Sequence, residues 1–546
     1  MTTRDLPRVQ RMRMPLAVDV VRDLAREYGV CVRPLPRRRV DMVTGESTVV
    51  PLPCGSTRGA VCQPCADKAR RLRMVQCREG WHLDDEPLPP ADDPTAEQKA
   101  IAEYRARLEA VRVDAPPGQL ADIDSAVVEA DEWLADLGVR GTPATTPTQP
   151  GGTAPARRVR STRRRQDTPD LPRLPVEART VGRVYTGRDG TTWRPSTFIT
   201  LTCDTYGRVR HDGTPVDPAT YDYQRAARDA IHFAALVDRW WQNLRRAAGF
   251  DVQYFAAVEP QRRLAPHLHA AVRGTIPRTL IRQVTAATYH HVWWPPCDQP
   301  VYPDRPPTWD PDTAAYVDPD TRRPLPTWNE ALDQLDTDPH AEPAHVARFG
   351  VQVDVQGVLG DTDRAARCIG YLTKYLTKNV DECHTPTTAA QRAHVDRLAD
   401  ALRHEPCSTR CANWLRYGVQ PDNPRAGLIP GQCRGKAHRR DTLGHAGRRV
   451  LVSRRWSGKT LTDHRADRRT HVLRVLGAAH TPATTPPENP GRWEWQPVHP
   501  DDTDAPARGS LLLRAIGEQA RWRSQYRWAQ AHPAPPDVPA TLDRAA

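Results

Sequence analysis

The chain contains no run of about 18 apolar residues, which excludes a membrane-spanning helix of ordinary length. Its N-terminal residues also lack the apolar segment and the cleavage site of a secretory signal, so we expect a cytoplasmic protein. Thiols stay reduced in the cytoplasm, and the 12 cysteines are therefore not expected to form disulfides. They occur in clusters, which favours metal binding instead.

Lysine is also scarce. Only six of the 78 basic residues are lysines, so arginine supplies the remaining 72. The formal net charge of +12 suits a polyanionic partner such as nucleic acid. The glycine-rich phosphate-binding loop of P-loop ATPases is missing, so an enzyme that needs separated DNA strands would depend on a separate helicase.

The 54 prolines indicate globular modules joined by stiff linkers, and we predict five segments. These are an N-terminal zinc-binding module (1–82), an acidic helical segment with a Pro/Arg-rich linker (83–184), a catalytic core with an insertion around 295–343 (185–400), a second zinc module with a basic DNA-contact segment (401–475), and a linker with a C-terminal helix (476–546).

The core segment has the pattern of an α+β fold. Alternating apolar residues predict strands at 198–203, 251–258, 267–272 and 349–358. Helical periodicity predicts helices at 223–247 and 364–379. This order favours a central antiparallel sheet with helices on one face.

Two histidines in the third of these strands form a candidate metal site. His267 and His269 are two residues apart, so both side chains project from one face of the strand. Glu259 ends the preceding strand and becomes a third ligand if the hairpin places it opposite His267. Two imidazoles and a carboxylate leave coordination positions open for a phosphate oxygen. The alternative for these residues alone is a surface or hydrogen-bonded histidine pair.

Tyrosine and lysine alternate at helical spacing in the second predicted helix. The residues that share one helix face are Tyr371, Lys374, Tyr375 and Lys378. A phenol is a poor nucleophile, but a neighbouring ammonium group stabilises the phenolate. Attack on phosphorus would give a phosphotyrosine ester and a free 3′-hydroxyl. A purely structural helix with solvated lysines is the alternative.

Two further groups have the spacing of zinc sites, and a full set of four ligands makes each a structural site. The first comprises Cys54, Cys62, Cys65 and Cys77, with His82 as a substitute candidate. The second comprises Cys407, Cys411, Cys433 and His438. The remaining cysteines are expected to be free thiols: Cys31, Cys203, Cys297, Cys368 and Cys383. The basic residues around the first group, Arg70 among them, contact either DNA or solvent.

Three segments, in this order, resemble the motifs of HUH-superfamily rolling-circle replication initiators. They are FITLT (198–202), PHLHAAV (266–272) and YLTKYLTK (371–378). The wider chain resembles the initiators of actinobacterial plasmids and integrative elements, and four segments carry this likeness. They are CGSTRGAVCQPCA (54–66), CANWLRYGVQP (411–421), CRGKAH (433–438) and SRRWSGKTLTDHRADR (453–468).

The resemblance implies an HUH endonuclease core in which His267 and His269 bind Mg²⁺ or Mn²⁺. It makes Tyr375 and Tyr371 the nucleophiles, with Tyr375 ranked first because related plasmid enzymes use only that position. Lys374 and Lys378 would steady the charge of the phenolate or phosphate.

The resemblance also implies what such a protein does. It would bind origin DNA, nick one strand where it is single-stranded, become linked to the 5′-phosphate, and leave a 3′-hydroxyl primer for host polymerase. Two alternatives remain at this point. One is a relaxase or transposase of the same superfamily, and the other is a non-catalytic zinc-containing regulator that binds DNA.

Overall fold

The computed structural model describes residues 15–81, 83, 85–86, 96–114, 123, 127, 168–181, 185–186, 188, 190, 192–193, 195–359, 362–374, 386–475, 492–498, 502 and 506–532. The chain divides into two compact units, Leu88–Arg165 and the remainder. The smaller unit contains helix α4 (Ala96–Asp114), within the predicted acidic helical segment.

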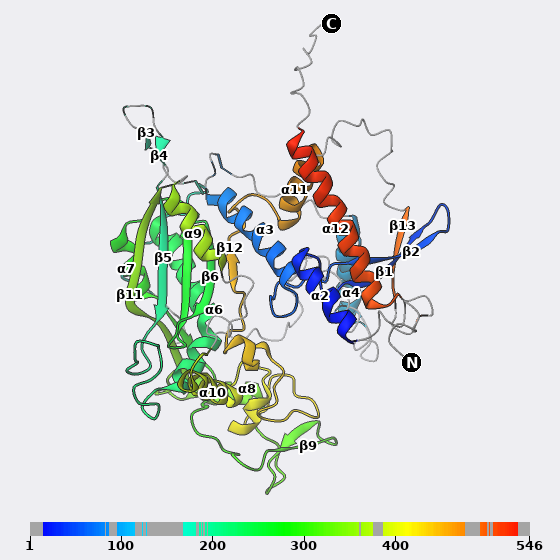
Figure 1. Cartoon of the computed structure of the whole chain (residues 1–546). Coiled ribbons are helices and arrows are strands. Elements are labelled where there is room, and N and C mark those ends of the chain that lie inside the picture. The colour runs from blue at the N-terminus through cyan, green and yellow to red at the C-terminus, as the bar shows by residue number, and fades with distance from the viewer. Residues whose placement is uncertain are drawn as a thin grey trace. The chain divides into compact units, whose positions relative to one another are not determined.

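The larger unit contains a six-stranded antiparallel sheet (Figure 1). Its strands, in spatial order, are β12 (Val450–Val452), β6 (Tyr254–Pro260), β7 (Pro266–Val272), β5 (Pro195–Cys203), β11 (His345–Leu359) and β8 (Tyr289–Val292). The four strands predicted from alternation are confirmed as β5, β6, β7 and β11. The edge strand β12 comes from the segment that we predicted as the second zinc module, so that segment contributes directly to the core sheet.

Two amphipathic helices, α6 (Tyr223–Ala248) and α7 (Arg278–Ala287), pack against one face of the sheet. A third helix, α10 (Ala389–His404), packs on α6. Asp222 caps the first turn of α6 by accepting a hydrogen bond from the backbone N–H of Arg225. Gly249 ends α6 with a positive φ of 71°, a conformation that glycine adopts without steric cost. Leu268 on β7 and Trp240 on α6 are both fully buried in this core.

The opposite face of the sheet is also covered by helices. α9 (Asp363–Lys374) packs on it through Ile369 and Leu372, and α3 (Gln63–Trp81) packs against α9. The expectation of helices on one face therefore describes only half of the sheet. The histidine-bearing face also carries Phe198 and Phe255, and these apolar rings require cover.

The two ends of the chain share one small sheet and one helix pair. β1 (Leu35–Asp41) lies between β2 (Ser47–Leu52) and β13 (Trp493–Pro497). α2 (Pro15–Glu27) packs on α12 (Arg508–Ala531). The N-terminal and C-terminal segments thus form one body, and α11 (Leu461–Val475) contacts both α3 and α12.

The insertion around 295–343 is folded and packs on the second cysteine group. It contains β9 (Thr308–Asp310), β10 (Ala315–Val317) and α8 (Trp328–Thr337). The cysteine group lies among short 3₁₀ helices: η4 (Ala412–Tyr417), η5 (Lys436–His438) and η6 (Arg440–Thr442). Trp414 packs against Trp328 and Trp294 with ring-centre distances of 5.0 and 5.6 Å. A two-stranded ribbon, β3 (Tyr185–Thr186) and β4 (Thr192–Trp193), precedes β5.

No helix within the described residues is both long enough and apolar enough to cross a membrane.

Candidate active site and metal centres

The β6–β7 hairpin has the register that the sequence analysis required. Glu259 lies directly opposite His267, and Ala257 lies opposite His269. On the other side of β7, the neighbouring strand β5 places Thr202 opposite His267 and Thr200 opposite His269. The alternation of the strand thus brings two imidazoles, one carboxylate and two hydroxyl groups onto one face.

The two threonines fix the orientation of the imidazoles. Thr200 Oγ1 lies 3.0 Å from Nδ1 of His269, and Thr202 Oγ1 lies 2.5 Å from Nδ1 of His267. Each ring therefore uses Nδ1 for support and keeps Nε2 for another partner, as metal-binding histidines do. Burial, with smaller contributions from His269 and Arg263, lowers the pKa of His267 to about 3. The ring is consequently neutral at physiological pH, which is the form that binds metal.

Helix α9 brings a tyrosine to the same point. The hydroxyl of Tyr371 lies 3.0 Å from Nε2 of His269 and 3.4 Å from Oε1 of Glu259. Nε2 of His269 is itself 3.0 Å from Oε1 of Glu259. Tyr371 keeps 41% of its surface exposed, whereas the flanking Leu372 is buried. The structure thus brings the phenol together with a carboxylate 112 residues and an imidazole 102 residues before it in the sequence.

The rest of the predicted tyrosine–lysine face is only partly described. Lys374 is exposed and is the last residue of α9 that the structure describes. Tyr375 and Lys378 lie outside the described residues, as do His82 and Cys383.

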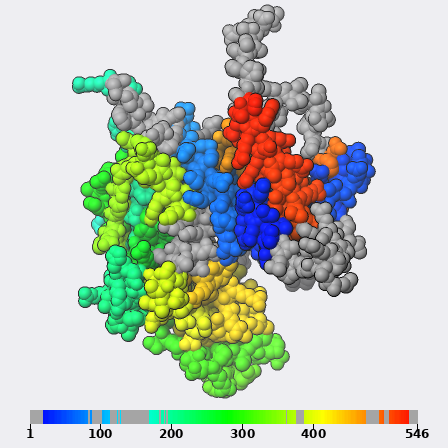
Figure 2. Space-filling model, in the orientation of Figure 1, coloured from blue at the N-terminus to red at the C-terminus, as the bar shows by residue number. Residues whose placement is uncertain are grey.

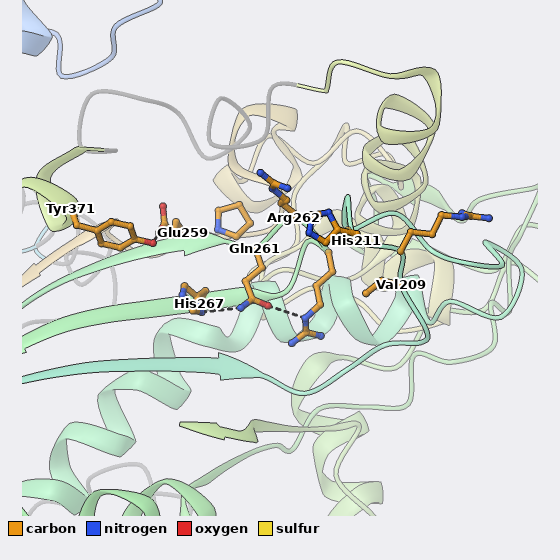
Figure 3. Close-up of a pocket in the computed structure, with 11 residues that line it drawn as sticks. Val209, His211, Glu259, Gln261, Arg262, His267 and Tyr371 are labelled. Carbon is orange, nitrogen blue, oxygen red and sulfur yellow. Dashed lines mark hydrogen bonds between the residues drawn. The ribbon is translucent and has the colours of Figure 1, made fainter. Parts of the chain in front are cut away.

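A pocket of about 510 Å³ opens beside these groups (Figure 3). Tyr371, Glu259 and His267 line one part of it, and the turn between β6 and β7 and the loop after β5 line the rest. Besides His267, the lining residues with a basic side chain are Arg210, His211, Arg262 and Arg263. The guanidinium of Arg210 donates to the carbonyl oxygens of Pro215 and Val216. The positive charge of three arginines around one pocket suits an anionic ligand with phosphate groups.

The two loops that form the pocket meet at a glycine. A Cβ atom on Gly213 would lie 2.5 Å from Cβ of Arg262 and 2.6 Å from its carbonyl carbon, so no side chain fits there. The side chain of Arg263 is fixed by the backbone, because its guanidinium donates to the carbonyl oxygens of Asp204 and Cys203 at 2.7 and 2.6 Å. Its Nε also donates to Oε1 of Gln261 at 2.8 Å. Arg262 is exposed and reaches the pocket from the same turn.

Donor atoms gather at three places within the described residues, each set lying within 4.8 Å of one another. Two of the sets are rich in cysteine, and the third consists of Glu79, His464 and Asp467. Glu259, His267 and His269 do not form such a closed set. Their donor types nevertheless fit a divalent cation, because imidazole and carboxylate are both common ligands for such ions.

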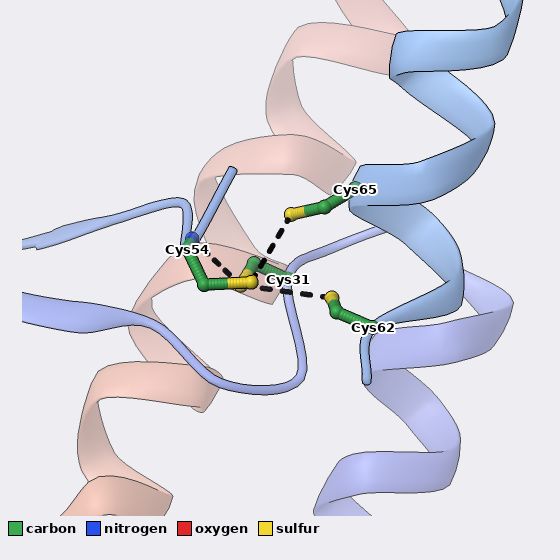
Figure 4. Close-up of side chains that lie close together, drawn as sticks. All are labelled: Cys31, Cys54, Cys62 and Cys65. Carbon is green, nitrogen blue, oxygen red and sulfur yellow. Dashed lines mark hydrogen bonds between the residues drawn. The ribbon is translucent and has the colours of Figure 1, made fainter. Parts of the chain in front are cut away.

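The first cysteine cluster differs from the prediction by one residue. Its members are Cys31, Cys54, Cys62 and Cys65, whose side chains converge (Figure 4). The Sγ atoms of Cys54 and Cys65 lie 3.8 Å apart, as do those of Cys62 and Cys31. Tetrahedral zinc with Zn–S bonds of about 2.3 Å separates its sulfur ligands by about 3.8 Å. The geometry therefore fits zinc.

Cys77 was predicted as the fourth ligand, and that prediction is wrong. It lies on α3, twelve residues after Cys65, and a helix rises about 18 Å over that length. Cys77 is instead fully buried beneath the sheet with Trp81. Cys31, which we expected to be a free thiol, takes its place and also accepts a hydrogen bond from the backbone N–H of Cys54 at 3.2 Å. Spacing favoured Cys77 over Cys31, because Cys77 lies closer in the sequence to the pair Cys62 and Cys65.

The second cluster contains the four predicted residues, Cys407, Cys411, Cys433 and His438. Nε2 of His438 lies 3.4 Å from Sγ of Cys411. The other ring nitrogen, Nδ1, lies 2.8 Å from the carbonyl oxygen of Leu402 and so is held by the backbone. A Cβ atom on Gly435 would lie 2.9 Å from Sγ of Cys407, so glycine is required beside the sulfur atoms. This site also fits zinc.

In the third set, a lysine already pairs with the negative charges of Glu79 and Asp467. Nζ of Lys459 lies 2.8 Å from Oδ2 of Asp467 and 3.5 Å from Oε2 of Glu79. His464 is fully buried and contacts Oγ of Ser457 at 3.0 Å and Oε2 of Glu79 at 3.2 Å. These contacts tie α11 to α3, so we interpret the set as a structural clamp.

An α+β unit with a histidine–carboxylate–tyrosine site, an arginine-lined pocket and two zinc-type clusters has the features of a protein that acts on nucleic acid. The chain matches the family model RepSA, described as replication initiator protein of pSAM2, over residues 17–518, and it belongs to that family. No similar chain was found among curated proteins or among solved structures. The prediction of a plasmid-type replication initiator is thereby confirmed at the level of the family.

Proposed function

We propose that the protein starts rolling-circle replication by nicking one strand of its origin with a tyrosine nucleophile, as an HUH-type endonuclease. The observation that carries the proposal is the position of Tyr371, whose hydroxyl lies 3.0 Å from His269 and 3.4 Å from Glu259. A nucleophile beside metal-type ligands and an arginine-lined pocket is the arrangement that cleavage of a phosphodiester needs.

In the proposed reaction, the phenolic oxygen forms a bond to phosphorus, and the bond between phosphorus and the O3′ atom of the preceding nucleotide breaks. The phenol releases its proton to water, and O3′ takes up a proton. One strand then ends in a 3′-hydroxyl that host polymerase can extend. The 5′-phosphate remains on the tyrosine, and the ester preserves the energy for later rejoining.

His267, His269 and Glu259 would hold Mg²⁺ or Mn²⁺, which when bound would polarise the scissile phosphate. The neutral state of His267 favours this role. Thr200 and Thr202 contribute by directing both rings toward the site. These threonines belong to the FITLT motif (198–202), so this motif orients the histidines of the PHLHAAV motif (266–272).

Two tyrosines are candidates for the nucleophile. The described geometry supports Tyr371, whereas the family resemblance ranks Tyr375 first. The two residues are four apart, one turn if α9 continues, so we propose that both serve, one in nicking and one in the closing transfer. Lys374, and Lys378 one turn later, would stabilise the phenolate or the phosphate charge.

The arginine-lined pocket would hold the phosphates next to the scissile one. Arg262 is the best placed of its arginines for this contact, since Arg263 donates to the backbone of residues 203 and 204 and Arg210 to that of residues 215 and 216. The two cysteine-rich clusters would each bind a structural zinc ion. The partners would be origin DNA, single-stranded at the nick, together with host helicase and polymerase.

A direct test uses labelled single-stranded oligonucleotides that tile the DNA flanking the protein's own gene, incubated with the full chain and Mn²⁺. We expect a covalent protein–DNA adduct that withstands denaturation. It should weaken in Tyr371→Phe or Tyr375→Phe and disappear in the double variant, while DNA binding persists. Binding without any adduct in the wild type would instead support a non-catalytic regulator, and an adduct that survives in the double variant would exclude tyrosine chemistry.

A further inference from the structure

Helix α3 links the first cysteine cluster to the tyrosine helix. Cys65 lies in its first turn and Cys62 immediately precedes it, so two of the four cysteines anchor its N-terminal end. Further along, α3 packs against α9, the helix that carries Tyr371. Figure 2 shows the residues of α3 lying directly beside those of α9.

The contact between the two helices has a polar part. Nε of Arg70 donates a hydrogen bond to the carbonyl oxygen of Thr373 at 3.0 Å. Thr373 is buried and lies two residues after Tyr371 on the same helix. The guanidinium of Arg70 therefore holds the backbone of α9 against α3 close to the tyrosine. The sequence predicts that Arg70 contacts DNA or solvent, whereas the structure shows it bonded to α9.

The contact also has an apolar part. Cys77 and Trp81 of α3 belong to the same buried cluster as Ile369 and Leu372 of α9. Tyr371 lies between these last two residues in the sequence, and its ring meets Phe198 of the same cluster edge-on at a ring-centre distance of 6.5 Å while its hydroxyl reaches Glu259 and His269. The direction of the phenol therefore depends on how α9 packs against both α3 and the sheet.

We propose that Arg70 is a positioning residue for the tyrosine helix, and that metal binding by Cys31, Cys54, Cys62 and Cys65 holds α3 where Arg70 can act. Arg70 lies five residues after Cys65, about 8 Å along the same rigid helix. Loss of metal at the cysteines therefore loosens α9, although none of the four cysteines reaches the active site. The effect of this link on catalysis rests on the function proposed for Tyr371, whereas the structural link between the cysteine cluster and α9 does not.

Hydrogen exchange measured by mass spectrometry on the full chain tests the polar link. In Arg70→Ala we expect the amides of 363–374 to exchange about tenfold faster than in the wild type, because a charge-assisted hydrogen bond is lost. Arg70→Lys should recover part of the protection. Arg71→Ala is the matched control, since this neighbour is exposed on the same helix. Zinc content should stay at the wild-type value in all three variants. Unchanged exchange in Arg70→Ala would overturn the proposal.

The link to the metal is tested by comparing the two cysteine clusters. Cys31→Ser should lower the zinc content and accelerate exchange in 363–374. Cys433→Ser should lower the zinc content equally but leave α9 protected, because its cluster packs on α10 and the insertion. Equal effects of both variants on α9, or none from Cys31→Ser despite zinc loss, would contradict the link. Since neither readout needs DNA cleavage, the link can hold even if the nicking proposal fails.

Discussion

The two faces of the central sheet use the same strands for different purposes. On β7, the side chains of Leu268 and Ala270 pack in an apolar core against α6. The side chains of His267 and His269 project from the opposite face, where they meet Glu259 and Tyr371. Both faces are covered by helices, so burial does not distinguish them. The difference is that polar groups on the second face are buried together with partners, and beside a pocket lined by arginine. Paired buried polar groups, rather than exposure, mark the functional face.

Removing one side chain from each face should separate stability from chemistry. We expect His269→Gln to reduce adduct formation more than about 100-fold, because a proposed metal ligand is lost, while the melting temperature changes little. Leu268→Ala should instead lower the free energy of unfolding by about 2–5 kcal/mol. Urea denaturation and the adduct assay measure both effects. If His269→Gln unfolds the protein as severely as Leu268→Ala, the histidine face is structural.

Two threonines of β5 allow the support of the histidine rings to be tested separately from the packing of the strand. Thr202→Val keeps the shape of the side chain but removes the hydroxyl that lies beside Nδ1 of His267. We expect about 10–100-fold weaker Mn²⁺-dependent nicking, measured as adduct formed against Mn²⁺ concentration. Thr197→Val on the same strand is the control, because its hydroxyl bonds to the carbonyl oxygen of Gly274 and not to a histidine. Equal losses in both variants would show that only strand packing matters.

The smallest expected effect concerns the arginines of the pocket. Arg262→Ala should weaken binding of a single-stranded oligonucleotide, and the slope of log K against log salt should fall in magnitude by about 0.7 for one lost phosphate contact. Fluorescence anisotropy at several salt concentrations measures the slope. Arg282→Ala serves as the control, because it is exposed on α7, which covers the other face of the sheet. An unchanged slope in Arg262→Ala would remove this arginine from the DNA path.

Much of the site could be predicted from local patterns. Strand alternation fixes which residues share a face, so the sequence predicted that Glu259 and His267 would lie opposite each other, and the register agrees. The second cysteine cluster was predicted completely, because residues 401–475 contain just three cysteines and His438 closely follows the last of them. In the first cluster, Cys77 offered a competing ligand, and spacing chose it over Cys31.

Contacts between distant segments could not be predicted in this way. Cys31 is separated from its cluster by a hairpin, and Arg70 meets Thr373 across 303 residues. Residues of α3 help to bury the histidine-bearing face of the sheet. The sequence of α3 does not indicate which part of the fold its apolar residues pack against. Such pairings depend on tertiary packing, which periodicity and spacing do not encode.

The most direct measurement identifies the residue that becomes joined to DNA. Trypsin cuts after Arg367, Lys374 and Lys378, so Tyr371 and Tyr375 fall in different peptides. After reaction with the nicked oligonucleotide and Mn²⁺, nuclease digestion and mass spectrometry should find a nucleotide 5′-phosphate on the peptide 368–374, on the peptide 375–378, or on both. A nucleotide attached anywhere else, or DNA that stays bound and uncut, would contradict the convergence of phenol, histidines and phosphodiester.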